Sequence, residues 1–186
     1  MIVTKSCASF RCVSLALLTL SLAACSTANA PAPIISVAEM DKDVETAAVN
    51  IESLTAVIEA NPRDATAYNT RGAAYARIGK YVKAEEDFTK AIELKPGYSA
   101  AFTNRALTYR QKGQDDLALN DFNRAITANG SYGAAYLGRG NLYRSLGKFP
   151  EAISDLTEAI KLNPESAQAY HARGLIFQKQ GLHKKA

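Results

Sequence analysis

The chain has 186 residues, with 22 Lys or Arg against 18 Asp or Glu and a formal net charge of +4. Its length suits one domain, and 47% hydrophobic residues with only 8% aromatic residues and no Trp suit an array of helices with small side chains. Lys5 and Arg11 lie in a segment that we expect to be removed, which leaves 20 basic residues and a net charge of +2. Proteins that bind phosphate backbones usually carry a clustered basic stripe and a pI above about 9. The composition therefore argues against nucleic-acid binding.

Residues 1–24 are predicted to be a lipoprotein signal peptide. Lys5 and Arg11 supply its positive start, and residues 13–24 form an apolar or hydroxyl-bearing stretch of 12 residues. Spanning a bilayer takes about 20 apolar residues, so this stretch is too short for a permanent membrane helix. Residues 22–25 read Leu-Ala-Ala-Cys, which resembles the lipobox of bacterial lipoproteins.

The lipobox resemblance implies that Cys25 begins the mature chain, with a diacylglycerol on its thiol and a third acyl chain on its amine. Several acyl chains give a stable anchor, because each buried methylene contributes about 0.8 kcal/mol. Ser26 follows in place of Asp, which implies the outer membrane, with the protein facing the periplasm. An alternative is an Ala-x-Ala site for ordinary secretion at residues 28–30, although Pro31 directly after that cut would hinder the peptidase.

Two segments link the signal to the rest of the chain. Residues 25–35 hold the lipidated Cys and a tether rich in Pro, Ala and Ser, whose extended form reaches roughly 33 Å. Residues 36–62 are predicted to form a capping helix, because their apolar residues recur at helical spacing before Asn61-Pro62. An array of repeats needs such a cap at its end.

From residue 65 the sequence repeats with a period of 34 residues. A period of this length predicts stacked supersecondary units, none of which can bury its apolar face alone. The residues that mark the period are Gly79, Gly113, Gly147 and Gly181; Arg71, Arg105, Arg139 and Arg173; and the aromatic residues Tyr68, Phe102, Tyr136, Tyr170, Tyr75, Tyr109, Tyr143 and Phe177. Repeat positions are counted here from residues 65, 99, 133 and 167.

The repeated pattern resembles the tetratricopeptide repeat (TPR), which has aromatic residues at positions 4 and 11, small residues at 8 and 20, an aromatic residue or Leu at 24, Ala at 27 and Pro at 32. In the first unit the matching residues are Tyr68, Gly72, Tyr75, Ala84, Phe88, Ala91 and Pro96. The second unit departs from the pattern only at its end, with Gly130 in place of the Pro. The resemblance implies an all-α fold, a right-handed α-solenoid of helix-turn-helix repeats. After the capping helix it has three full repeats, at 65–98, 99–132 and 133–166, and a partial repeat at 167–186.

Each repeat should contain two antiparallel helices, joined by a turn at the Gly of position 15. A positive φ at this turn costs little only for Gly. The expected first helices span 66–78, 100–112, 134–146 and 168–180, and the expected second helices span 82–94, 116–128 and 150–162. The nine tyrosines all fall at positions 4, 11, 17 or 34, so we interpret them as packing residues. The helix before the first repeat keeps the same register, because Leu54 and Pro62 lie one period before Phe88 and Pro96.

The sequence predicts no catalytic residue, no cofactor site and no metal site. His171 and His183 have no Cys or carboxylate at ligand spacing. Cys7, Cys12 and Cys25 lack the spacing of a zinc or redox pair. We therefore expect no enzyme activity.

Arg at position 7 recurs together with Asp at position 23. The pairs are Arg71 with Asp87, Arg105 with Asp121, and Arg139 with Asp155. Because Arg forms directional two-pronged bonds with a carboxylate, the recurrence predicts a ladder of ion pairs within a repeat or between neighbours. The alternative is a habit of the family without pairing.

The expected first helices contain no Asp or Glu. In TPR folds these helices line the inner groove and the second helices form the outer wall. We therefore expect a positive groove that binds an acidic protein or peptide partner. The candidate groove residues are Asn69, Arg77, Thr103, Asn104, Arg110, Asn141, Arg144, His171 and Lys179. The alternative is that the arginines only balance acidic residues on the outer helices.

The carboxylate clamp of chaperone-binding TPR proteins, which holds a C-terminal carboxylate, is not reproduced. Asn104 matches one of its positions, but the Lys and Arg positions hold Asn69, Ala134 and Gly138. This departure argues against a role as a cochaperone.

Lipobox, tether, capping helix and repeats together resemble the layout of NlpI-type outer-membrane lipoproteins. The resemblance implies an adaptor for periplasmic proteases or peptidoglycan enzymes. The alternatives are an assembly factor for pili or outer-membrane proteins and a structural protein of the envelope. The fourth repeat stops at Ala186 within its second helix, so we expect an open face at Tyr170 and Phe177. That face would be available for self-association.

Overall fold

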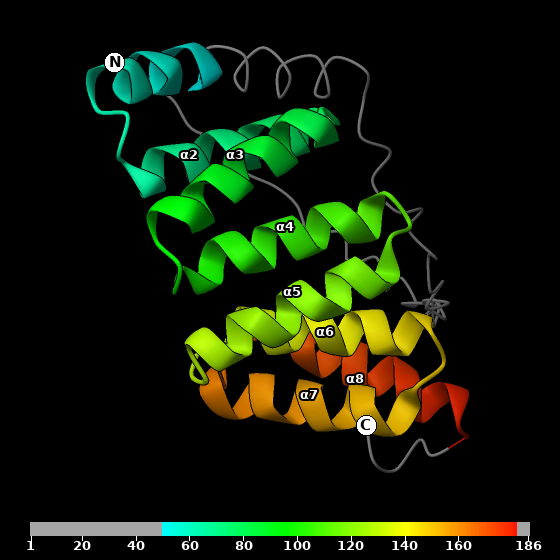
Figure 1. The fold of residues 1–186 in the computed structure, drawn as a ribbon. Helices are drawn as coiled ribbons and strands as arrows, with labels where there is room; N and C mark the ends of the chain where they lie inside the picture. Colours follow the sequence, from blue (N-terminus) through cyan, green and yellow to red (C-terminus); the bar gives the residue numbers. More distant parts are fainter. Residues whose placement is uncertain (1–49, 182–186) are drawn as a thin grey trace, which may run out of the picture. The chain divides into compact units, whose positions relative to one another are not determined.

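The structure is a computed structural model in which residues 50–181 are described. The signal peptide, Cys25, the tether, the start of the capping helix and residues 182–186 lie outside the described residues. The described part is all-α and consists of helices packed in pairs (Figure 1). Residues 50–60 are helical and are followed by α2 (Ala65–Arg77), α3 (Tyr81–Leu94), α4 (Ser99–Gln111), α5 (Asp115–Ala128), α6 (Gly133–Ser145), α7 (Phe149–Leu162) and α8 (Ala167–Lys179).

The sequence predicted every one of these helices from α2 to α8 within one residue at each end. The turns inside the repeats form at the expected glycines, whose φ angles lie between 69° and 74°. An L-residue with a side chain would be strained there. Pro150 was expected to open its helix, but α7 begins at Phe149. Pro150 still lies in the first turn, where its missing N–H costs no helical hydrogen bond.

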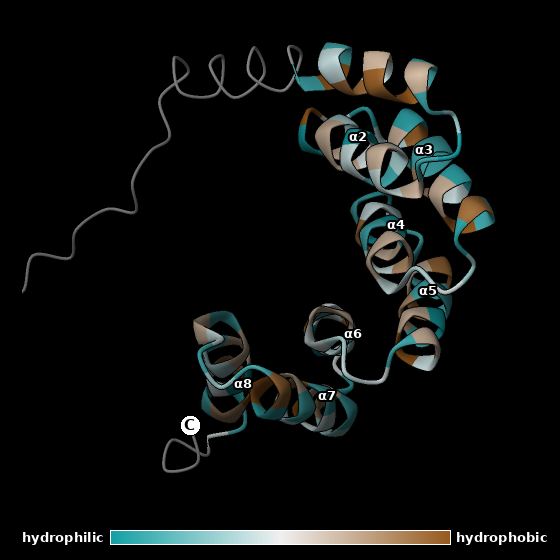
Figure 2. Ribbon diagram, turned by 90° about the vertical axis from the view of Figure 1, so that its left-hand side faces the viewer, coloured by the Kyte–Doolittle hydropathy of each residue, from teal (hydrophilic) through white to brown (hydrophobic). Residues whose placement is uncertain are grey.

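The repeats stack so that their first helices lie on the inner side. Neighbouring first helices, such as α2 and α4, contact each other, whereas α3 and α5, or α5 and α7, do not. A stack that is tighter along one row of helices curves toward that row. Figure 2 shows α2, α4, α6 and α8 along the inside of the arc formed by the repeats. This side is the groove, as the TPR resemblance implied.

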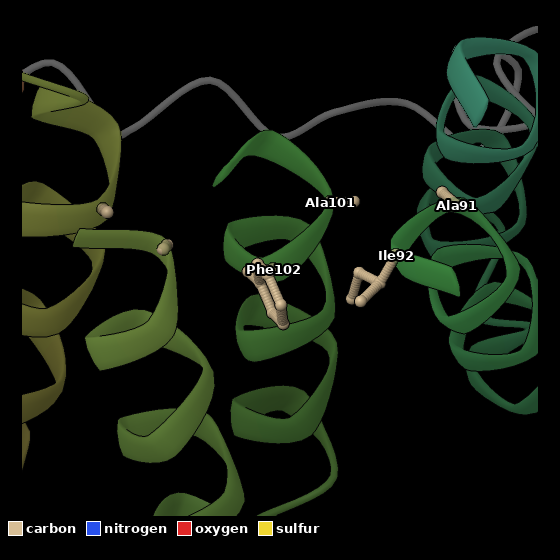
Figure 3. Packing of buried hydrophobic residues seen from close by; sticks show 6 residues of the cluster. Ala91, Ile92, Ala101 and Phe102 are labelled. Carbon is tan, nitrogen blue, oxygen red and sulfur yellow. The ribbon is translucent and has the colours of Figure 1, made fainter. Parts of the chain in front are cut away.

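Small residues allow the helices to approach, and large residues fill the space that remains. Figure 3 shows Ala91 and Ile92 of α3 facing Ala101 and Phe102 of α4, and all four are buried. At position 24, Phe88, Phe122 and Leu156 are each almost fully buried. Burying such a side chain contributes roughly 1.5–3 kcal/mol, so these positions hold the core of each repeat together.

The arginines at position 7 bind in two directions. Arg105 donates from Nε and Nη2 to both carboxylate oxygens of Asp121, and from Nη1 to Thr89 Oγ1 of the preceding repeat at 2.9 Å. Arg139 repeats this arrangement with Asp155 and with Asn123 Oδ1. The predicted pairing is therefore real, and the alternative of a pattern without pairing is wrong. Each arginine joins the two helices of its own repeat and also bonds to the repeat before it.

The same contact ties the N-terminal helix to the first repeat. Arg71 donates from Nη1 to Thr55 Oγ1 at 3.1 Å, and its other nitrogens bind Asp87. Thr55 lies one period before Thr89, the residue that Arg105 contacts. Residues 50–60 therefore pack as a second helix against the first repeat, in the predicted register.

At the other end, α8 exposes a different set of residues from the predicted one. Tyr170 is 47% exposed as expected, but Phe177 is half-buried, and Leu175 is the second exposed large residue at 36%. Side chains at position 11 point toward the packed core. Tyr109 and Tyr143, which share this position, are half-buried in the same way as Phe177. Position 9, held by Leu175, faces the groove.

Candidate functional site

The inner surface contains a hollow of about 740 Å³ between α4, α6 and α8, which we call the C-terminal pocket. It brings together the predicted groove residues Arg110, Asn141, Arg144 and His171. Arg110 and Arg144 both lie at position 12, one repeat apart, so the stacking places their charges in the same hollow. The remaining lining residues are Gly113, Asp115, Ser145, Gln168, Ala172 and Leu175.

The two arginines of the C-terminal pocket have no counter-ion in the described part of the chain. Neither Arg110 nor Arg144 takes part in an ion pair there, and the Nε of Arg144 is buried without a hydrogen-bond acceptor. A buried donor without a partner costs free energy that a ligand oxygen near it can recover. Asp115 lines the same pocket and partly opposes their charge.

The position-7 arginines of the three full repeats differ, because each pairs with an Asp. The hydrogen bond to Asp87 raises the pKa of Arg71, although burial opposes it, and Asp155 acts in the same way on Arg139. Burial lowers the pKa of Arg105, but the hydrogen bond and charge of Asp121 outweigh burial and raise it. The observed first helices also contain no Asp or Glu. The unpaired positive charge of the C-terminal pocket therefore comes from Arg110 and Arg144 at position 12.

A second hollow of about 390 Å³ lies between α2 and α4, and we call it the N-terminal pocket. It holds two predicted residues, Arg77 and Asn104. Asn104 donates through Nδ2 to Asn69 Oδ1 at 3.0 Å, so these two predicted residues are joined to each other across the first helices. The other lining residues are Ala73, Ala76, Tyr81, Phe88, Leu107, Thr108 and Gln111.

Three predicted groove residues, Asn69, Thr103 and Lys179, line neither pocket. Thr103 is only 3% exposed, and its hydroxyl has no hydrogen-bond partner within residues 50–181. At this exposure its side chain cannot meet a partner directly. His171 occupies the same position on α8 and is exposed, because no described helix follows. Lys179 places its Nζ over the Phe149 ring, 5.3 Å from the centroid.

Sequence reasoning missed part of the lining. Gln168 at position 2 and Leu175 at position 9 line the C-terminal pocket, and Ala73 and Leu107 at position 9 line the N-terminal pocket. Reading positions 2, 9 and 12 down all repeats would have found them, because each position recurs on the same face of successive helices. Charged and amide groups alone do not reveal them, because these residues are mostly apolar.

No metal site emerges from the residues that the structure describes, because they contain no group of three or more His, Cys, Asp or Glu side chains able to hold an ion. A search of the same residues for membrane spans finds no helix with sufficient length and apolar character.

The chain is similar to proteins of known family and known structure. Family profiles described as "Tetratricopeptide repeat" match residues 65–98 and 103–155, and one described as "TPR repeat" matches residues 140–181. The first TPR of Spaghetti (RPAP3), solved with an HSP90 peptide, is 31% identical, and this chain covers 93% of it. This chain belongs to the tetratricopeptide-repeat family. No curated protein matches significantly.

Other solved TPR structures share the fold. The RPAP3 fragment has a TM-score of 0.59 over 63% of this chain. The second TPR domain of human RPAP3, solved with an HSP70 peptide, is 31% identical, with a TM-score of 0.54 over 59% of this chain and 91% of its own. A structure of MamA has a TM-score of 0.65 over 81% of this chain and 88% of its own, at 23% identity. At that identity the similarity to MamA concerns the fold alone.

The structure explains why a carboxylate clamp is absent from this TPR chain. The Arg position of the clamp is held by Gly138, and a Cβ built there would fall on the Phe122 ring. Phe122 is fully buried in the second repeat, so a side chain at position 138 would have to displace a ring of the core. The unpaired arginines of the C-terminal pocket, Arg110 and Arg144, lie elsewhere, at position 12 of the second and third repeats.

Proposed function

We propose that this TPR scaffold is anchored in the bacterial cell envelope through lipid on Cys25 and binds an acidic segment of a protein partner in its groove. The segment would lie against the first helices, with carboxylates near Arg110 and Arg144. In this role the chain is an adaptor that holds a partner, such as a protease or peptidoglycan enzyme, close to the membrane.

One observation carries the binding proposal. Arg110 and Arg144 share a concave pocket and lack counter-ions within residues 50–181, while the arginines at position 7 of the three full repeats are paired. Fields from like charges add in a concave surface of low dielectric constant, which attracts an anionic partner. Arginine also binds carboxylates in a bidentate manner.

The related structures support an acidic partner in a limited way. The RPAP3 domains were solved with peptides whose sequences, SRMEEVD and SGPTIEEVD, end in Glu-Glu-Val-Asp. An acidic segment is therefore within the range of ligands of chains 31% identical to this one. Because Gly138 removes the clamp, the carboxylates would bind this chain at the C-terminal pocket instead.

The envelope part of the proposal rests on the sequence around Cys25 and has its own test. Replacing Cys25 with Ala should move the protein from the membrane fraction to the soluble periplasm, because the thiol that carries the lipid is lost. The repeats should keep their helical circular dichroism. A mature N-terminus at Pro31 in an intact-mass measurement would contradict the anchor and support ordinary secretion.

Affinity capture from a solubilised envelope fraction tests the binding part. The double variant Arg110→Glu, Arg144→Glu should lose partners that the wild type retains. A matched control, Arg63→Glu with Lys95→Glu, makes the same charge change at exposed residues on the connections before α2 and after α3. The control should retain the partners, and equal loss in both double variants would mean that net charge, and not the groove, selects them.

A further inference from the structure

We propose that the two pockets act together and recognise a bipartite segment, in which an apolar side chain enters the N-terminal pocket and acidic residues lie in the C-terminal pocket. This inference rests on the acidic partner proposed above. It adds that charge alone does not define the ligand.

The two pockets adjoin on α4. Leu107 lines the N-terminal pocket and Arg110 lines the C-terminal pocket. Residues three apart lie on the same face of a helix, separated by about 4.5 Å along its axis. One extended segment that crosses α4 can therefore contact both pockets.

Small residues open the N-terminal pocket. Position 12 holds Ala76 in the first repeat but Arg110 and Arg144 in the next two, and position 9 holds Ala73 in the first repeat. Without long side chains at these positions, a hollow of about 390 Å³ remains beside Phe88 and Leu107. This volume falls within the range of about 300–1,000 Å³ that is typical of ligand pockets.

The chemistry of the N-terminal pocket favours an apolar side chain. Phe88 is buried and Leu107 is half-buried, and both line the pocket. The nearby Thr108 donates its hydroxyl hydrogen bond to the Asn104 carbonyl, and the Asn104 amide donates to Asn69. These donors are thus already engaged. Arg77 is the one cation among the lining residues and is exposed.

The C-terminal pocket has the opposite chemistry. Arg110 and Arg144 supply charge, while Asn141, Gln168 and His171 supply polar groups around them. Asp115, Ala172 and Leu175 also line this pocket, but its two unpaired arginines make a carboxylate the group that gains most from it. From the N-terminal to the C-terminal pocket the lining therefore becomes more strongly cationic, which gives a bound segment a defined register.

Three labelled peptides of equal length test the inference by fluorescence anisotropy. Two carry a leucine beside a run of glutamates, on its N-terminal or its C-terminal side, because the direction of the bound chain is open. The third carries serine in place of leucine. We expect one leucine peptide to bind the wild type at least tenfold more tightly than the serine peptide.

Filling the N-terminal pocket should remove this advantage. The variant Ala73→Leu, Ala76→Gln introduces residues that occur at the same positions in α8, as Leu175 and Gln178, so the repeat fold accommodates them. The leucine and serine peptides should then bind with equal affinity, close to that of the serine peptide for the wild type. The control Ala60→Gln, at an exposed residue outside both pockets, should keep the tenfold difference.

The outcomes separate the two proposals. If both leucine peptides bind no more tightly than the serine peptide, or the filled variant keeps the difference, the bipartite inference is wrong while acidic binding stands. If no peptide binds the wild type more tightly than it binds Arg110→Glu, Arg144→Glu, the acidic groove itself is wrong, and the inference fails with it.

Discussion

Arg105 and Asp121 join the two helices of the second repeat through two hydrogen bonds, Nε to Oδ2 at 2.7 Å and Nη2 to Oδ1 at 3.0 Å. The two side chains are only 12% and 4% exposed. Removing one partner of a buried ion pair leaves the other charge without compensation.

We therefore predict that Asp121→Ala lowers the free energy of unfolding by about 3–5 kcal/mol, measured by urea denaturation. The matched control is Glu158→Ala, which breaks the exposed pair with Lys161 and should cost at most about 1 kcal/mol. Equal costs for the two variants would contradict a structural role for the buried pair.

The N-terminal helix should depend on the corresponding contact of the first repeat. Thr55 accepts from Arg71 and donates to the Ile51 carbonyl at 2.7 Å. Thr55→Val keeps the shape but removes both bonds, so we expect a loss of about 1 kcal/mol and faster amide exchange in residues 50–60.

Thr70→Val is the control for this prediction. Thr70 is exposed and bonds only within its own helix, to the Thr66 carbonyl. It should leave exchange in residues 50–60 unchanged. If Thr55→Val also left that exchange unchanged, the helix would be held by packing alone.

Gly138 should not tolerate even a methyl group. A Cβ at this position would fall on the Phe122 ring, and overpacking of this kind costs about 1–3 kcal/mol. The gain in helix propensity, about 1 kcal/mol, offsets only part of it, so we expect Gly138→Ala to destabilise the protein. Gly97→Ala meets no atom within 4 Å and should change stability by less than about 0.5 kcal/mol. A Gly138→Ala protein as stable as the wild type would show that Phe122 can shift.

Stability should fall at high pH because of Tyr109. Burial raises the pKa of its phenol, and the nearby Glu85, which accepts its hydrogen bond at 3.1 Å, raises the pKa further against the opposing charge of Arg105. The folded state thus keeps the proton to a higher pH than the unfolded chain, in which tyrosine has a pKa of about 10. The stabilising contribution is complete below that pH and is lost as the pH rises through the folded pKa.

Urea midpoints measured at rising pH check this prediction. The wild type should lose stability more steeply above a pH of about 10 than Tyr109→Phe, which has no phenol to titrate at this position. Parallel curves for the two proteins would contradict a raised pKa at Tyr109.

The sequence predicted the helices closely because the 34-residue register places them and because several boundaries have a local cause. Asp64 accepts hydrogen bonds from the N–H groups of Thr66 and Ala67 and thus caps α2, and the glycines at position 15 adopt positive φ. The site was harder to predict, because a repeat position shows which face a residue lies on but not what covers it. Thr103 and His171 share position 5, yet only His171 is exposed.

The pockets show a second limit of sequence reasoning. The N-terminal pocket exists because Ala73 and Ala76 lack long side chains, and the absence of atoms gives no charge or motif to recognise. Asp115 shows a related limit. It occupies position 17, where Tyr81 and Phe149 stand in other repeats. Its carboxylate instead lines the C-terminal pocket.

The central claim is that Arg110 and Arg144 bind acidic partners, and one titration tests it most directly. A labelled glutamate peptide is titrated with the wild type, with Arg110→Glu, Arg144→Glu, and with the control Arg63→Glu, Lys95→Glu, at about 50 mM and about 300 mM salt. We predict that the groove variant loses at least tenfold in affinity, about 1.4 kcal/mol, that the control stays close to the wild type, and that salt weakens wild-type binding. Affinity that is indifferent both to the groove reversal and to salt would contradict the claim.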